Sequence, residues 1–182
     1  GPRMEGMPMG ILVAKDASSF VTEVGNVDRI STLSADGTLT TLAGSAEEGF
    51  VDGRGEAARF WNLMGMAEGP DGRIYVADCH NNSIRRVDRQ GNVTTVAGGG
   101  PVARVEDQQT IDGDLTVARF NGPSAVAVAS DGTIYVGEQI GKCVRVIHEG
   151  MITTLHRCGG KVLGLLLDEP NGILYASLMH GI

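Results

Sequence analysis

The sequence predicts an all-β protein built from repeated units of four short antiparallel strands, and three observations lead to this fold class. Twenty-seven glycines against six prolines among 182 residues indicate many turns and short strands. The chain matches itself when it is displaced by sixty residues. All three of its tyrosines, Tyr75, Tyr135 and Tyr175, fall at the same position of the repeat. A repeat with these properties decides the fold before any single strand is assigned.

The sixty-residue match runs through short motifs that recur in the same order. The matched segments are Asp52-Gly53 with Asp112-Gly113, Ala58-Arg59-Phe60 with Ala118-Arg119-Phe120, Asp71-Gly72 with Asp131-Gly132, and Ile74-Tyr75-Val76 with Ile134-Tyr135-Val136.

The elements follow in chain order, copy by copy. In the first copy, Ile11–Ala14 matches Ile74–Ala77 of the second, which leaves an apparent insertion at about Ala17–Gly25. The second copy is the best formed: alternating or β-branched apolar residues predict strands at about Met64–Glu68, Ile74–Asp78, Ser83–Asp88 and Val93–Ala97. Turns at Pro70-Asp71-Gly72 and Gln90-Gly91 join them, with glycine supplying the positive φ that a tight hairpin needs.

The third copy repeats this pattern, and the fourth begins near Val162 and reaches Ile182 before its outer strands. The approximate units are 1–44, 45–98, 99–158 and 159–182, the last incomplete, and together they form one domain over 1–182. One four-stranded sheet of this size cannot shelter both faces from water, whereas sheets stacked face to face around an axis can. We therefore expect β-propeller blades of four antiparallel strands in a partial ring of about four blades. The rest of a longer chain or another subunit would complete the ring.

The second copy, DGRGEAARFWNLMGMAEGPDGRIYVADCHNNSIRRVDRQGNVTTVAG, closely resembles the NHL-repeat consensus, and Asp112–Leu155 is a second good copy. This resemblance covers nearly the whole chain and implies an NHL-type propeller, a fold that usually closes with about six blades. Relatives of the repeat include a lyase with a propeller-centred zinc, hydrolases that use calcium, and animal RNA-binding proteins, so the resemblance leaves function open.

Charge and composition narrow the function classes. A formal net charge of −7 argues against a nucleic-acid partner, because phosphate contacts need clustered lysine and arginine. No run of eighteen apolar residues is present, which predicts a soluble chain with no membrane span. Cys79, Cys143 and Cys158 have no metal-ligand or disulfide spacing and are expected to be separate thiols.

The candidate binding surface is the face of the disc that carries the long connections. In an up-and-down sheet the tight turns share one face, and the second-to-third loops and blade-to-blade crossovers share the other. The crossovers at Gly44–Arg59 and Gly98–Arg119 fall on that second face and are acidic, which favours a protein partner with basic character. The candidate binding residues are Glu47, Glu48, Asp52, Glu56, Glu106, Asp107, Asp112 and Asp114.

Other recurring residues are predicted to be structural. Phe60 and Phe120 should wedge between blades, and Arg59 and Arg119 should hydrogen-bond crossover carbonyls. Arg85, Arg86 and Arg145 lie on third strands, with Arg85 and Arg86 on opposite faces.

No catalytic residues, metal ligands or cofactor are predicted, because the four histidines occupy non-equivalent repeat positions. A Ser-His-Asp arrangement lacks its GxSxG motif, and no phosphate-binding glycine loop is present. The sequence therefore favours a non-catalytic protein–protein interaction scaffold that uses the long-loop face or the open edges of the propeller. The alternative is a metal-assisted lyase or hydrolase with an axial site completed by missing blades, for which His80 and His180 are the least unfavourable pair.

Overall fold

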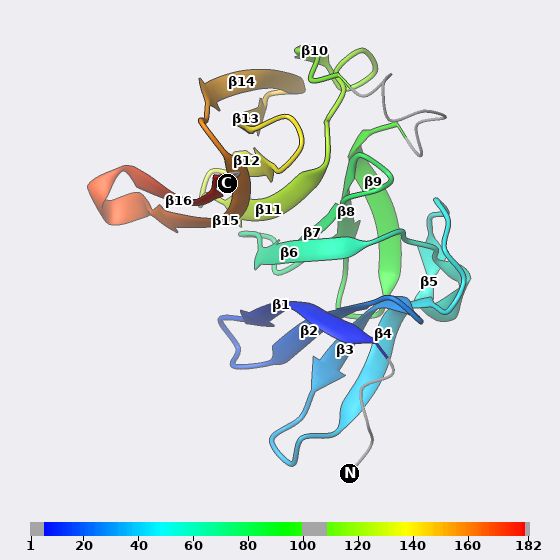
Figure 1. The fold of residues 1–182 in the computed structure, drawn as a ribbon. Helices are drawn as coiled ribbons and strands as arrows, with labels where there is room; N and C mark the ends of the chain where they lie inside the picture. The colour runs from blue at the N-terminus through cyan, green and yellow to red at the C-terminus, as the bar shows by residue number, and fades with distance from the viewer. Residues whose placement is uncertain (1–5, 100–108, 181–182) are drawn as a thin grey trace.

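The computed structural model describes residues 6–99 and 109–180 as four antiparallel sheets that radiate from a common axis (Figure 1). Within each sheet, neighbouring strands follow one another in the chain, except that two of the sheets gain one short outer strand from the preceding crossover. Sheet 1 comprises β1 (Met7–Val13), β2 (Ser19–Val24), β3 (Asp28–Leu33) and β4 (Leu39–Ser45). Sheet 2 comprises β6 (Leu63–Glu68), β7 (Ile74–Asp78), β8 (Ser83–Val87) and β9 (Asn92–Gly98), with the short β5 (Gly53–Arg54) added outside β9.

The other two sheets continue the arc. Sheet 3 comprises β11 (Pro123–Val128), β12 (Ile134–Glu138), β13 (Cys143–His148) and β14 (Met151–Arg157), with β10 (Gly113–Asp114) outside β14. Among the described residues, sheet 4 comprises β15 (Lys161–Asp168) and β16 (Ile173–Met179). The first strands β1, β6, β11 and β15 lie nearest the axis and contact one another in succession. This arrangement is that of propeller blades, as the repeat predicts.

Two hydrophobic cores lie between consecutive sheets. The core between sheets 1 and 2 contains Phe60 together with Ile30 of β3 and Val87 of β8. The core between sheets 2 and 3 contains Phe120 together with Ile84 of β8. Both phenylalanines are almost fully buried, which confirms that they wedge between blades. At these two interfaces the sheets therefore shelter their facing apolar sides against one another.

The predicted alignment of the first copy is wrong by one strand. In sheets 2 and 3 the repeat tyrosine lies on the second strand and pairs with an alanine of the first strand, Ala67 with Tyr75 and Ala127 with Tyr135. In sheet 1 the equivalent pair is Leu12 with Phe20, so Phe20 occupies the tyrosine position. Ile11–Val13 accordingly belongs to the first strand, and the supposed insertion at 17–25 is a tight turn followed by β2. First and second strands are both short apolar segments, and without the tyrosine the pattern could not tell them apart.

The long crossovers also differ from the expected free loops. The segment 49–60 forms a hairpin-like excursion, tied by a bridge between Val51 and Arg59, and it adds β5 to the outer strand β9. The segment after Thr110 repeats this arrangement with a bridge between Ile111 and Arg119. Each crossover thus runs along the outer edge of its own sheet.

A buried arginine holds each crossover excursion in place. The Arg85 guanidinium donates to the Asp78 carboxylate at 2.7 Å, to the Asp52 carboxylate at 2.7 Å, and to the carbonyls of Val51 and Arg59. Its side chain has no exposed surface. Burial raises the pKa of Asp78 to about 6 even with the guanidinium beside it, so this carboxylate is costly to bury alone.

Sheet 3 repeats the arrangement at equivalent positions. The Arg145 guanidinium donates to Glu138 and to Asp112, each at 2.8 Å, and to the carbonyls of Ile111 and Arg119. Arg59 and Arg119 bond carbonyls within their own crossovers, as predicted. The excursion is therefore a structural part of each blade.

The three cysteines are free thiols, as the spacing predicts. Cys79 and Cys143 are almost fully buried, whereas Cys158 is half-buried. Burial raises the pKa of Cys79 to about 11 and that of Cys143 to about 12. Cys79 is therefore poorly suited to act as a nucleophile.

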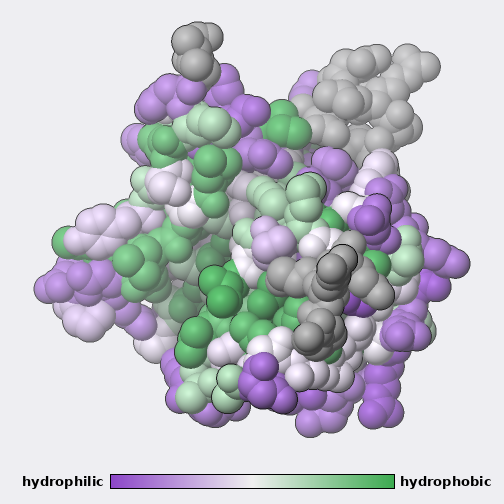
Figure 2. Space-filling view, turned by 60° about the horizontal axis from the view of Figure 1, so that its bottom comes forward, coloured by the Kyte–Doolittle hydropathy of each residue, from purple (hydrophilic) through white to green (hydrophobic). Residues whose placement is uncertain are grey.

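Both ends of the arc present hydrophobic surface. Ile11 and Val13 of β1 are 68% and 67% exposed, and Leu166 of β15 is 65% exposed. Figure 2, which brings the lower side of Figure 1 forward, shows hydrophobic surface gathered near the middle and towards the left of that side. Within residues 6–99 and 109–180, no helix is long and apolar enough to cross a bilayer.

Replacing Arg85 with methionine should destabilise the fold by about 3–5 kcal/mol, because it leaves the Asp78 carboxylate buried without its cation. Urea unfolding followed by the fluorescence of the single tryptophan measures this. Arg86→Met, on the opposite face of the same strand, is the matched control and should cost about 1 kcal/mol or less. Equal losses for the two variants would contradict a special role for the buried guanidinium.

One thiol should react quickly with a disulfide reagent at pH 8, and it should be Cys158. The other two thiols should react only when urea opens the fold, because they are buried and their pKa values lie far above 8. The absorbance of the released thiol counts the reacting groups. Cys158→Ser should remove the fast phase; a fast phase that survives in this variant would show that a sheet opens readily.

Candidate functional site

The predicted acidic residues do not share one face. Asp52 and Asp112 are half-exposed and bind the buried arginines, and each also accepts a hydrogen bond from a threonine of the outer strand. Glu56 lies in the short helix η1 (Gly55–Ala57), beside the turn that contains Gly91. Asp114 accepts hydrogen bonds from Thr116 and Val117. The crossover excursion carries these four carboxylates towards the third-to-fourth-strand turns, away from the face where the sequence places them.

Two of the predicted acids remain at the crossover end of the first two sheets. Glu47 is exposed and bonds the Arg59 guanidinium at 2.9 Å. Glu48 is exposed and lines a groove. Glu106 and Asp107 lie outside the described residues, so their predicted place stays untested.

The groove beside Glu48 has a volume of about 210 Å³ and lies between the crossover ends of sheets 1 and 2. We call it the Trp61 groove. Its residues come from β1, from the adjoining ends of β2 and β3 with the turn between them, from the crossover, and from the loop between β7 and β8. They are Met7, Val24, Gly25, Asp28, Glu48, Trp61, Asn62 and His80.

Backbone hydrogen bonds between two segments make the aromatic wall of the groove rigid. The His80 amide donates to the Trp61 carbonyl and the Cys79 amide donates to the Asn62 carbonyl. The Trp61 and His80 rings meet edge to face, with centroids 5.2 Å apart. The Trp61 amide also donates to the Asp78 carboxylate at 2.8 Å. The buried ion pair of sheet 2 thus positions the tryptophan.

Asp28 provides a buried carboxylate at the floor of the groove. Its Oδ1 accepts hydrogen bonds from the Asn62 amide at 2.9 Å and from the Leu63 amide at 3.4 Å. Burial raises the pKa of Asp28, and the nearby charge of Glu48 raises it further. Two carboxylates and an aromatic ring therefore meet in one groove.

The repeat shows that the charge of Asp28 exceeds what the fold requires. At the next interface, Asn82 occupies the equivalent position and its amide oxygen accepts the bond from Gly122 at 2.8 Å. A neutral amide therefore suffices to join two sheets here. Trp61 and His80 likewise have Asn121 and Ile140 as their equivalents, so the acidic and aromatic character belongs to the first interface alone among the described residues.

Sequence reasoning missed Asp28 and Trp61. Asp28 was hidden because the first copy was misaligned, which removed its match to Asn82. Trp61 carried a signal in the sequence, since it is the only tryptophan of the chain and directly follows the recurring Ala58-Arg59-Phe60 motif.

No three His, Cys, Asp or Glu side chains among residues 6–99 and 109–180 lie close enough together to hold a metal ion. His80 lies in the Trp61 groove, whereas His180 lies near Gly160 beyond sheet 3.

Comparison with known proteins gives distant similarities. No protein-family model matches the chain. It is 35% identical over 83 residues to Protein SUPPRESSOR OF QUENCHING 1, chloroplastic, of Arabidopsis thaliana, covering 44% of this chain and 8% of that protein. It is 29% identical over 122 residues to NHL repeat-containing protein 2 of Bos taurus, covering 62% of this chain and 16% of that protein. The chain therefore spans less than a fifth of the length of either relative.

Two solved structures of similar fold are nearly twice as long as this chain. The structure matches a gluconolactonase, XC5397 from Xanthomonas campestris, with a TM-score of 0.69 at 18% identity, over 97% of this chain and 56% of that one. It matches the virginiamycin B lyase from Staphylococcus aureus with a TM-score of 0.61 at 17% identity, over 97% and 50%. At these identities the similarity shows the fold alone. The tyrosine-marked repeat, the radiating sheets and the similarity to an NHL repeat-containing protein together identify the chain as a set of NHL-type β-propeller blades.

Proposed function

We propose that the protein is a non-catalytic protein–protein interaction module that binds a basic segment of its partner in the Trp61 groove. The observation that carries this proposal is Asp28, a buried carboxylate at a position where the next interface uses the neutral amide of Asn82. Burying a charge that the fold does not need is unfavourable, so a cationic ligand accounts for its presence.

The remaining features of the groove suit one lysine or arginine side chain. Glu48 is exposed at the rim, where it can pair with a cation that enters. Trp61 presents an aromatic ring, which attracts a cation and packs against its aliphatic stem. The volume of the groove is about 210 Å³, whereas small-molecule sites typically have volumes of about 300–1,000 Å³. The smaller volume favours a single side chain as the ligand over a substrate or cofactor. The net charge of −7 would steer a basic partner towards the protein.

The metal-assisted lyase or hydrolase stays an alternative prediction. The gluconolactonase and the virginiamycin B lyase are enzymes, but at 17–18% identity they support only the shared fold. No observation in the described residues favours that reaction over binding.

A peptide of alternating lysine and glycine should change the fluorescence of Trp61 in a saturable way, since this single tryptophan lines the groove. Asp28→Asn should weaken binding by about tenfold or more, the loss of one charge-assisted contact, while the amide keeps the bonds to Asn62 and Leu63. Glu48→Gln should weaken binding in the same sense. Glu56→Gln is the matched control, because Glu56 lies near the opposite end of the outer strand.

The proposal fails if Asp28→Asn binds the lysine peptide as tightly as the unaltered protein while its urea midpoint is unchanged. It also fails if a peptide with glutamine in place of lysine produces the same fluorescence change.

Affinity for the lysine peptide should fall as the pH is lowered. Burial raises the pKa of Asp28 above the ordinary 3.8, so this carboxylate takes up a proton at a higher pH than a free aspartate and then no longer attracts the cation. The His80→Gln background removes the imidazole from the groove, so that the carboxylates are tested without it. Calorimetric titrations with the lysine peptide from pH 7.5 to 4.5 should show this loss of affinity in His80→Gln. In the double variant Asp28→Asn/His80→Gln the affinity should depend much less on pH.

A further inference from the structure

Three of the four buried carboxylates among residues 6–99 and 109–180 are paired with an arginine of the chain. The pairs are Glu23 with Arg29 at 3.0 Å, Asp78 with Arg85 at 2.7 Å, and Glu138 with Arg145 at 2.8 Å. The fourth carboxylate is Asp28, which is 3% exposed and is hydrogen-bonded by two backbone amides instead. A buried carboxylate without a cation is unfavourable, so a ligand that brings a cation to Asp28 completes the pattern of the other three.

The chain's own pairs show how many acceptors a guanidinium uses in this protein. Arg29 donates from Nε to one oxygen of Glu23 at 3.0 Å and from Nη2 to the other at 3.2 Å. Arg85 divides its donors between two carboxylates and two backbone carbonyls. A planar fork of five N–H donors is satisfied only by such a set of acceptors.

Asp28 offers a ligand a single oxygen. Its Oδ1 already accepts the Asn62 amide at 2.9 Å and the Leu63 amide at 3.4 Å, which leaves Oδ2 for the groove that Asp28 lines. The carbonyls of Trp61 and Asn62 also accept backbone amides, from the loop between β7 and β8. A guanidinium in the groove could therefore not fork onto both oxygens of Asp28, and it would find fewer acceptors than Arg85 has.

Glu48 is the second acceptor, on an exposed side chain at the rim. Its charge is close enough to raise the pKa of Asp28. An ammonium carries three N–H donors that point in separate directions, so one can bond Asp28 Oδ2 and another a Glu48 oxygen. Its remaining donor can bond water at the rim, and its aliphatic stem can pack on Trp61. The acceptors of the groove thus match an ammonium better than a guanidinium.

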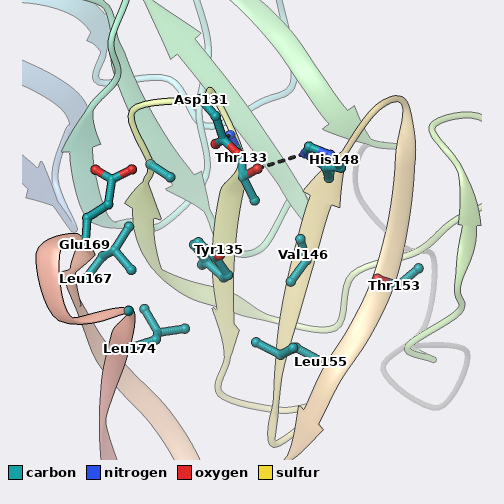
Figure 3. A pocket seen from close by; sticks show the side chains of 12 residues that line it. Asp131, Thr133, Tyr135, Val146, His148, Thr153, Leu155, Leu167, Glu169 and Leu174 are labelled. Atoms are coloured by element: carbon teal, nitrogen blue, oxygen red, sulfur yellow. Dashed lines mark hydrogen bonds between the residues drawn. The ribbon is translucent and has the colours of Figure 1, made fainter.

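A larger hollow of about 680 Å³ between sheets 3 and 4 is lined differently (Figure 3). Figure 3 shows leucine and valine side chains directed into it. Its two carboxylates, Asp131 and Glu169, are both exposed. Asp131 accepts the Thr133 amide at 2.8 Å, and Glu169 accepts the Ser130 amide at 2.9 Å. Water and these bonds satisfy both charges, so this hollow lacks the buried, incompletely bonded carboxylate that distinguishes the Trp61 groove.

We propose that the Trp61 groove recognises the primary ammonium of a lysine side chain and discriminates against guanidinium and multiply methylated ammonium groups. This inference rests on the proposed function and narrows the partner to one whose lysine carries at most one methyl group. Each added methyl group removes one N–H donor, which leaves two in monomethyl-lysine, one in dimethyl-lysine and none in trimethyl-lysine. With two carboxylates to satisfy, binding is retained through the first methylation and weakens over the next two.

Fluorescent peptides that alternate glycine with lysine, arginine, or mono-, di- or trimethyl-lysine test this, with blocked termini so that the side chains are the only cations. Fluorescence anisotropy with the 182-residue protein should give similar Kd values for lysine and monomethyl-lysine. The arginine and trimethyl-lysine peptides should each bind about tenfold more weakly or worse, the loss of one charge-assisted bond, with dimethyl-lysine between. Attraction to the Trp61 ring alone would favour trimethyl-lysine instead, as in aromatic cages.

Two variants that make the same change of charge in the same groove locate the discrimination. Asp28→Asn should bring the ratio of lysine to arginine affinity close to one, because it removes the carboxylate that offers a single oxygen. Glu48→Gln should weaken both peptides but keep the preference for lysine, since the exposed Glu48 can offer both oxygens to a guanidinium. Glu56→Gln, outside the groove, should change neither affinity. Urea midpoints show whether each variant is folded.

Three results would overturn this inference: arginine binding as tightly as lysine, trimethyl-lysine binding as tightly as lysine or more so, or a preference for lysine that survives in folded Asp28→Asn. Each of these leaves the proposed function intact, because a cation still binds in the groove. If none of the cationic peptides binds, the proposed function itself fails, so the two failures are distinguished.

Discussion

The buried pairing of a third-strand arginine with a carboxylate at the end of the second strand organises this protein. Arg85 bonds Asp78 of its own sheet, the carbonyls of Val51 and Arg59, and the Asp52 carboxylate. One guanidinium thus joins the inner part of the sheet to the crossover that enters it. Removing either partner leaves the other charged and buried, so the pair acts as a unit. Its planar fork of donors makes arginine, and not lysine, suitable for so many acceptors.

The variations of this pair follow from what each sheet has to hold. In sheet 1, Ser31 occupies the arginine position and bonds Glu23 at 2.6 Å, while Arg29, two residues earlier, bonds the same carboxylate at 3.0 Å. In sheet 4, Leu178 replaces the carboxylate, and the entering connection is short. In sheets 2 and 3 the arginine and its carboxylate therefore accompany a long crossover excursion.

The same pairing reduces the acidic surface that the crossovers present. Asp52 and Asp112 neutralise buried arginines, and Asp114 accepts hydrogen bonds from its own turn. Net charge counted along the sequence consequently overstates the acidity of the crossover face. The charge that stands out is Asp28, since Asn82 performs the same inter-sheet bonding with a neutral amide.

The sequence by itself determined the local character of the protein: short apolar strands, glycine turns, a sixty-residue repeat, and recurring Phe60 and Phe120 between sheets. These features are set by residues a few positions apart or by exact recurrence, which a single sequence displays directly.

The sequence could not place the first copy, because Phe20 replaces the marker tyrosine and the first and second strands have the same apolar pattern. Only the tertiary structure decided where the crossovers run and which carboxylates remain at the groove, because those positions depend on bonds between residues more than thirty apart, such as Asp52 with Arg85 and Asp28 with Asn62. Local patterning records which face of a strand is buried, but the partner of a buried charge is chosen by the packing of separate sheets.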